Sequence, residues 1–120
     1  MLQGVENRAK YEFPRRVKRE IIRRQNYCCA CCKNHQDTVG KLEVHHSLPI
    51  FIAYNCFPFL APRIIQSIEN AVGLCHDCHA KIHIQIDHII KKAQASPDQD
   101  TVALLRQSFQ PIAQALLRLR

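Results

Sequence analysis

Residues 70–83, "NAVGLCHDCHAKIH", gather two cysteines, three histidines and an aspartate within fourteen positions. Thiolates and imidazoles are the ligands that zinc prefers in proteins. Cys75 and Cys78 have the C-x-x-C spacing of a zinc knuckle. His79 and His83 lie four residues apart on an expected helix, so their rings project from one face about one turn apart. The stretch therefore predicts two metal sites, one built on sulfur and one on nitrogen.

A second group of cysteines, "CCACC" at residues 28–32, supplies a partner for the first knuckle. Two C-x-x-C pairs give the four thiolates that a tetrahedral structural zinc site requires. Two registers compete here, because both Cys28 with Cys31 and Cys29 with Cys32 have the spacing. Spacing alone does not choose between them. Cys56 stands alone in an apolar segment and is expected to fill the core.

The stretch "KLEVHHSL" at residues 41–48 alternates side chains as a short strand does, and this places His45 and His46 on opposite faces. His45 would complete a three-nitrogen site with the helical pair if the strand lies beside the helix. Three protein ligands leave coordination positions open, as a catalytic ion requires. His46, near the ion but not bound to it, would be free to take a proton from water.

Positive charge is concentrated at the N-terminal end of the chain. The formal net charge is +7, and residues 1–33 hold nine Lys or Arg against three Glu, a net charge of +6. "RRVKREIIRRQ", residues 15–25, follows Pro14 and predicts a basic amphipathic helix. This distribution indicates a polyanionic partner, most commonly nucleic-acid phosphate. The expected DNA contacts are Arg15, Arg16, Arg19 and Arg23.

The second half of the chain is more apolar. Residues 49–69 carry three prolines and predict a covered loop with a short helix near residues 63–68. A helix is expected after Cys75 and should run to about Ala95, and a last helix is expected from Ser96 and Pro97. We divide the chain into a domain of residues 1–95 and a C-terminal helix of residues 96–120. The seam of that helix predicts either a homodimer or packing on the chain's own core, with a kink at Pro111; it consists of Val102, Leu105, Phe109, Ile112, Leu116 and Leu119.

The N-terminal stretch "MLQGVENRAKYEFPRR" lacks the apolar region of a signal peptide, and no segment reaches the roughly 20 apolar residues that span a bilayer. Seven cysteines, an odd number with knuckle spacing, indicate reduced thiols. We therefore expect a cytoplasmic or nucleoid-associated protein with no membrane partner.

Taken together, "LEVHH", "NAVGLC" and "CHAKIH" resemble the motif of the HNH endonucleases, the ββα-metal nuclease family. In that alignment the first His is His46 with its metal-binding neighbour His45, the Asn is Asn70, and the last His is His79 with His83 after it. "RRQNYCCACC" resembles the family's lead-in to its zinc knuckle and selects Cys29 and Cys32 as partners of Cys75 and Cys78. The resemblance covers residues 24–83.

The resemblance implies an α+β fold with a small ββα-metal, treble-clef-like core, a basic helix before it and an extra helix after it. It also implies a DNA endonuclease that uses His46 as general base and leaves 5′-phosphate and 3′-hydroxyl ends, with the Asn70 amide securing the hairpin. Many members carry Asp where this chain has His45, so the site here should suit zinc, nickel or manganese better than magnesium. The alternative is a non-catalytic, zinc-dependent nucleic-acid-binding module.

Overall fold

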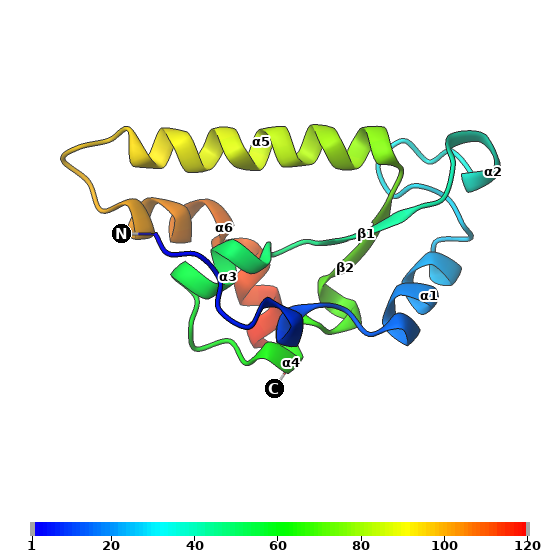
Figure 1. Cartoon of the computed structure of the whole chain (residues 1–120), viewed down its shortest axis with the longest axis horizontal. Helices are drawn as coiled ribbons and strands as arrows, with labels where there is room; N and C mark the ends of the chain where they lie inside the picture. The colour runs from blue at the N-terminus through cyan, green and yellow to red at the C-terminus, as the bar shows by residue number, and fades with distance from the viewer. Residues whose placement is uncertain (1, 120) are drawn as a thin grey trace.

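The computed structural model describes residues 2–119, which form a mixed α+β fold with one two-stranded antiparallel sheet. This confirms the expected α+β class. Figure 1 shows the sheet beside one end of a long helix, with shorter helices gathered beneath the other end. In chain order the elements are η1 (Arg8–Tyr11), α1 (Arg15–Arg24), α2 (Gln36–Val39), β1 (Glu43–His46), α3 (Ile50–Cys56), α4 (Pro62–Ile65), η2 (Ile68–Asn70), β2 (Ala71–Leu74), α5 (His76–Gln94) and α6 (Thr101–Leu117).

The hairpin of β1 and β2 presents one face to α1 and the other to α5. His45 pairs with Val72 and His46 with Ala71, so the two histidines point to opposite faces, as the alternation predicts. On the α1 face, Val44 and Ala71 pack with residues of that helix, such as Val17. On the α5 face, the side chain of His45 meets that of His79.

The main hydrophobic core lies away from the hairpin and joins α3, α4, α6 and the second half of α5. The prediction of a covered loop after residue 49 is wrong for its first part, since residues 50–56 form α3. Pro49 stands just before the helix, where its missing N–H costs nothing. Ile52, Ala53 and Cys56 then bury one face. The short helix α4 ends at Ile65, earlier than expected.

The last helix begins later than the sequence suggested. Its N-cap is Asp100, whose side chain accepts hydrogen bonds from the amides of Val102 and Ala103, so the predicted start at Ser96 is wrong. Asp is a strong N-cap residue, and it lies two positions before the first apolar residue of the helix, Val102. Pro111 lies inside α6, and Figure 1 shows the helix changing direction along its length.

The apolar seam of α6 packs on the chain's own core. Leu105 is completely buried, Phe109 and Leu116 are nearly so, and Val102 and Ile112 are partly buried against the same cluster. Helix α6 thus shares one core with residues of the 1–95 segment. Of the two alternatives for the seam, the structure shows packing on the chain's own core for all of its residues except Leu119, which is exposed. No helix within residues 2–119 has the length and apolar character needed to cross a membrane.

The seam gives a test of the fold. Leu105→Ala should lower the free energy of unfolding by about 2–5 kcal/mol, because it removes a fully buried side chain and leaves a cavity. Leu119→Ala is the matched control, since Leu119 is 38% exposed and should change stability little. Urea unfolding of both variants measures the difference. Equal stabilities of the two variants would contradict the packing of α6 on the core.

Candidate metal centres

Four cysteines converge at the start of α5, two from the loop after α1 and two from the N-cap and first turn of α5 itself. They are Cys29, Cys32, Cys75 and Cys78, and their sulfur atoms all lie within 4.8 Å of one another. The Sγ atoms of Cys32 and Cys75 are 4.0 Å apart. Tetrahedral zinc with Zn–S bonds of about 2.3 Å places its sulfurs about 3.8 Å apart. The donors and their spacing therefore fit a metal ion such as zinc.

Local backbone geometry chooses between the two registers in "CCACC". The amide of Cys29 donates to the carbonyl of Asn34, and the carbonyl of Cys29 accepts from the amide of Lys33, whose φ is +69°. This tight turn points Cys29 and Cys32 toward α5. The sulfur of Cys28 instead lies 3.4 Å from the Asn26 carbonyl, and the four-sulfur group contains Cys29 and Cys32 but neither Cys28 nor Cys31.

The surroundings of one sulfur in the cluster, that of Cys29, favour the thiolate form. Cys75 is the residue before the first turn of α5 and Cys78 lies in that turn, where the helix dipole favours negative charge. Burial raises the pKa of Cys29, but backbone amides, chiefly those of Cys75 and Cys32, outweigh it and lower the pKa to about 6. The contact with the Cys75 thiol raises the pKa of Cys78. Cys29 is thus the sulfur prepared to ionise.

Gln25 fastens the knuckle of Cys29 and Cys32 to the sheet. Its side-chain amide donates to the carbonyls of Cys28 and Gly73 at 2.8 and 3.0 Å, and its oxygen accepts from the amide of Gly73 at 2.8 Å. A Cβ at residue 73 would meet the Gln25 nitrogen at 3.0 Å. Glycine is therefore what lets the glutamine approach β2 this closely. The sequence analysis missed this role, because the two residues are 48 positions apart.

The three histidines expected to bind the second ion also converge. Nδ1 of His45 lies 3.2 Å from Nε2 of His79, which lies 2.9 Å from Nε2 of His83. Tetrahedral zinc with Zn–N bonds of about 2.05 Å places its nitrogens about 3.3 Å apart. Burial, and then the charges of neighbouring histidines, lowers the pKa of His45 to about 4. His45 therefore stays neutral, the form that binds a metal.

Glu43 orients the central histidine of this cluster. One carboxylate oxygen lies 2.7 Å from Nδ1 of His79, and the other lies 3.1 Å from Nδ1 of His76. Its pKa is lowered by the hydrogen bond to His79 and then by that to His76. The ionised carboxylate fixes Nδ1 of His79 as the protonated nitrogen and leaves Nε2 free for a ligand bond. Glu43 was missed, although it lies two residues before His45 and so shares its face of the strand.

His46 occupies the other face of β1, among aromatic residues. Its ring stacks on that of Phe13 with centroids 3.8 Å apart, and its Nε2 lies 2.9 Å from the backbone carbonyl of Tyr11. A carbonyl only accepts, so Nε2 carries the proton and Nδ1 has a free lone pair. Burial lowers the pKa of His46 against the opposing effect of the Tyr11 carbonyl. The neutral ring is therefore suited to accept a proton at Nδ1.

Asn70 lies just before β2 and is completely buried. Its side-chain oxygen accepts from the amide of Leu48, and its nitrogen donates to the carbonyls of Leu48 and Ile65. Its backbone carbonyl accepts from Ser47. The side-chain amide thus makes two hydrogen bonds with Leu48, just after β1, and one with Ile65 at the end of α4. The geometry gives Asn70 a positioning role and no proton-transfer role.

The four arginines expected to contact DNA do not share one environment. Arg15 and Arg19 face a groove beside β1, whereas Arg16 lies on the side of α1 toward α4. Arg23 forms two hydrogen bonds with the carboxylate of Glu20, at 2.9 and 2.6 Å. Arg23 is therefore already paired, while the groove brings in Lys18 and Lys41, which the sequence analysis did not select.

Comparisons with family models, with curated proteins and with solved structures found no match to this chain. The interpretation of the site therefore rests on its own geometry and on the motif resemblance.

The sulfur cluster predicts that replacing either of two neighbouring cysteines has different effects on zinc content and stability. Cys29→Ser should lose tightly bound metal and unfold at lower temperature, because structural zinc supplies much of the folding energy of small domains. Cys28→Ser is the neighbouring control and should keep its metal. Elemental analysis and thermal unfolding of the two proteins measure this. Full zinc content in Cys29→Ser with loss in Cys28→Ser would show that the other register is the real one.

The nitrogen cluster predicts a role for Glu43. Glu43→Gln should weaken binding of the exchangeable ion by about 10- to 100-fold, because His79 loses the carboxylate that fixes its tautomer. Titration of the zinc-loaded protein with Ni²⁺ measures the affinity. Glu69→Gln removes the same charge from an exposed position and should leave it unchanged. Equal nickel affinities for the two variants would remove Glu43 from the site.

Proposed function

We propose that this chain is a metal-dependent DNA endonuclease of the HNH type. The observation that carries the proposal is the arrangement around β1. His45 joins two helical histidines on one face, while His46 offers an unprotonated Nδ1 from the other. A binding module has no use for a neutral imidazole on the residue next to a metal ligand. The motif resemblance, which includes Asn70, points to the same reaction class.

The nitrogen cluster would hold the catalytic ion. Three protein nitrogens leave room for water and a phosphate oxygen, and nitrogen donors suit zinc, nickel or manganese better than magnesium. A divalent ion bound there supplies positive charge against the scissile phosphate and the leaving oxygen. Glu43 keeps the ring of His79 turned toward that position. The four cysteines would hold a separate structural zinc.

His46 would act as the general base. Its Nδ1 takes a proton from water as the water oxygen forms a bond to phosphorus, and the bond from phosphorus to the 3′ oxygen breaks. The imidazolium that results keeps its Nε2–H bond to the Tyr11 carbonyl, which stabilises the added charge. The products are a 5′-phosphate and a 3′-hydroxyl. Asn70 holds the segment after His46 in place throughout.

The alternative is a zinc-dependent module that binds nucleic acid without cleaving it. Like the proposed enzyme, it would bind DNA in a reducing compartment. It accounts for the cysteines and the basic helix. It leaves the three-histidine cluster, its supporting glutamate and the desolvated His46 unexplained. Burying polar side chains such as His45 and His46 costs free energy, and titratable groups with shifted pKa values gather at functional sites, so this arrangement favours a catalytic role.

The proposal predicts that His46→Ala abolishes cleavage while DNA binding and metal content stay near those of the parent. Loss of a general base costs about 10² to 10⁴ in rate. Nicking of supercoiled plasmid with added Mn²⁺, Ni²⁺ or Zn²⁺ measures the rate. His88→Ala, which changes an exposed histidine on α5, is the control and should cleave normally. Parental rates from His46→Ala would exclude it as the base.

The same assay separates the two functions. An endonuclease should convert supercoiled plasmid to nicked or linear forms only when a divalent ion is added. A protein that binds the plasmid but leaves it intact with every ion, while holding its zinc, would be the non-catalytic module.

A further inference from the structure

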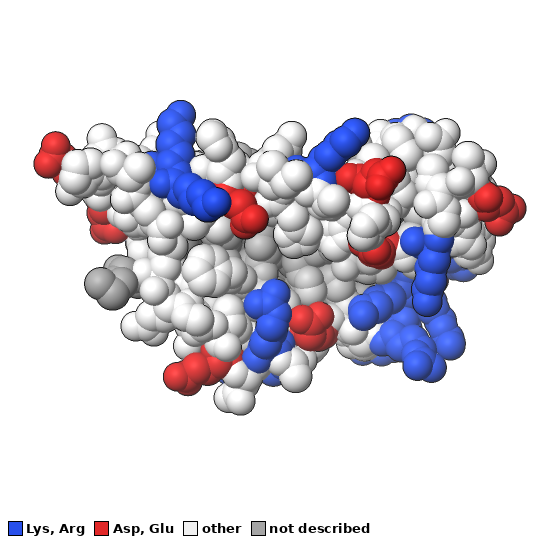
Figure 2. Space-filling view, turned by 45° about the horizontal axis from the view of Figure 1, so that its top comes forward, with Lys and Arg blue, Asp and Glu red and all other residues white. Residues whose placement is uncertain are grey.

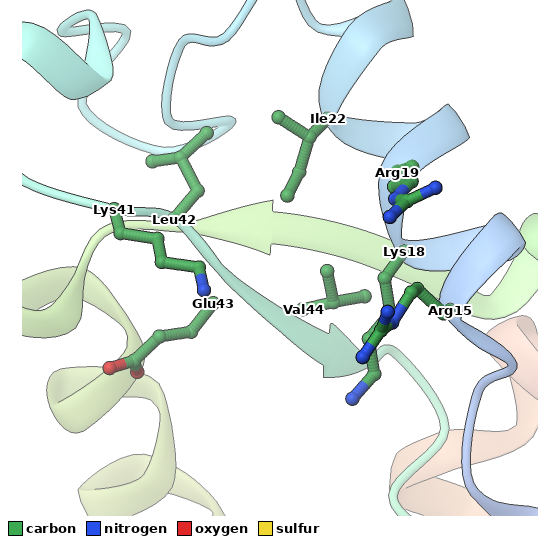
Figure 3. A pocket seen from close by; sticks show the side chains of 8 residues that line it. All are labelled: Arg15, Lys18, Arg19, Ile22, Lys41, Leu42, Glu43 and Val44. Atoms are coloured by element: carbon green, nitrogen blue, oxygen red, sulfur yellow. The ribbon is translucent and has the colours of Figure 1, made fainter.

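An open groove of about 730 Å³ runs between α1 and β1. One wall is the face of α1 that carries Arg15, Lys18 and Arg19, and the other wall begins at Lys41. Figure 3 shows the basic side chains of α1 gathered on the open side of Val44, with Lys41 extending along β1 from the opposite side. In Figure 2, Lys and Arg gather most densely at the end of the molecule where α1 lies.

The cations of this groove are available for a ligand. Arg15, Lys18 and Arg19 follow the i, i+3, i+4 spacing that places side chains on one helix face. All are exposed, as is Lys41. Within residues 2–119, none of these four cations forms an ion pair with a carboxylate.

Two other cations of α1, in contrast, do form ion pairs with a carboxylate. Arg23 and Arg24 both bind the carboxylate of Glu20, at 2.6 and 3.0 Å. These two arginines lie toward the end of the same helix and carry the same charge as the groove residues. Among the residues that the structure describes, the cations of α1 that face the groove, Arg15, Lys18 and Arg19, are therefore unpaired, whereas Arg23 and Arg24 are paired and do not line it.

The floor of the groove is apolar. Ile22, Leu42 and Val44 line it beneath the basic rim. A sugar–phosphate backbone matches both features, because its phosphates meet cations while the faces of its deoxyribose rings lie on apolar side chains. An acidic peptide would place carboxylates on the rim but would set its polar backbone on this floor. The combination favours a nucleic-acid strand.

The groove also adjoins the nitrogen cluster. Glu43 lines the groove, and its carboxylate holds His79. His45 is two residues further along the same strand. A strand rises about 3.3 Å per residue, so Glu43 at the groove and His45 in the nitrogen cluster lie about 7 Å apart along β1. A DNA strand in the groove would therefore reach the metal centre within a few nucleotides.

We propose that the groove between α1 and β1 binds the sugar–phosphate backbone of the DNA strand that leads into the nitrogen cluster. This inference rests on the proposed function for its choice of DNA. The binding is to phosphate and sugar, so it should be independent of base sequence. Arg19 and Lys41, one from each wall, grip the strand from both sides.

The test compares two double variants of the full-length, zinc-loaded chain. Arg19→Gln with Lys41→Gln removes one cation from each wall, and Arg23→Gln with Arg24→Gln removes two cations that Glu20 already pairs. Both variants lose two positive charges. Fluorescence anisotropy with labelled duplexes of two unrelated sequences, without an added divalent ion, gives the affinity between 50 and 200 mM salt. Zinc content checks that each variant is folded.

The groove variant should bind both duplexes at least about tenfold more weakly at 100 mM salt, and its slope of log K against log salt should fall by about 2. The control variant should stay within about twofold of the parent. Equal losses in both variants, or a loss confined to one sequence, would overturn the groove. So would binding of poly-glutamate in preference to DNA, which would make the occupant an acidic protein segment.

Binding is measured here without cleavage, so the two proposals fail separately. If the groove variant loses affinity but the parent cleaves no plasmid with any ion, the groove stands and the endonuclease does not. If the parent cleaves plasmid and the groove variant binds DNA as tightly as the parent does, the endonuclease proposal stands and the groove proposal fails.

Discussion

The convergence of four cysteine sulfurs at the first turn of α5 is the constraint on which the rest of the site depends. Cys75 and Cys78 fix where α5 begins and how it is rotated. Successive residues of a helix differ by about 100° in direction, so Cys78 and His79 point to different sides. Once sulfur holds the helix start, His79 and His83 face β1 and His45. The nitrogen cluster thus takes its geometry from the sulfur cluster.

This dependence matters because little apolar packing supports the hairpin. The main core lies around α3 and α6, whereas the cluster beneath the sulfur site contains few large apolar side chains. Polar contacts make up the difference, with Gln25 tying the knuckle to β2 and Asn70 tying β1 to the segment before β2. Loss of metal should therefore unfold the hairpin region more readily than the helical core, because the hairpin region has less apolar packing.

Short-range patterns carried most of what the sequence could predict. The knuckle spacing, the i, i+4 histidines and the strand alternation each depend on a few neighbouring residues, and each has the expected geometry. The contacts that were missed join distant positions. Tyr11 lies 35 residues from His46, and Gln25 lies 48 from Gly73, so no local period could indicate either pair. Helix α3 was missed because the three prolines of residues 49–69 suggested a loop. The cap at Asp100 was missed because Ser96 followed by Pro97 also resembles a helix start.

The central claim is that one helix start carries two distinct metal positions, one of sulfur and one of nitrogen. Stepwise loading of the metal-free, reduced protein with Co²⁺, followed by X-ray absorption at the cobalt edge, tests it most directly. The first equivalent should be surrounded by four sulfur atoms, and a second, more weakly held equivalent should show only nitrogen and oxygen neighbours. Uptake of a single equivalent, or sulfur around both, would contradict the account.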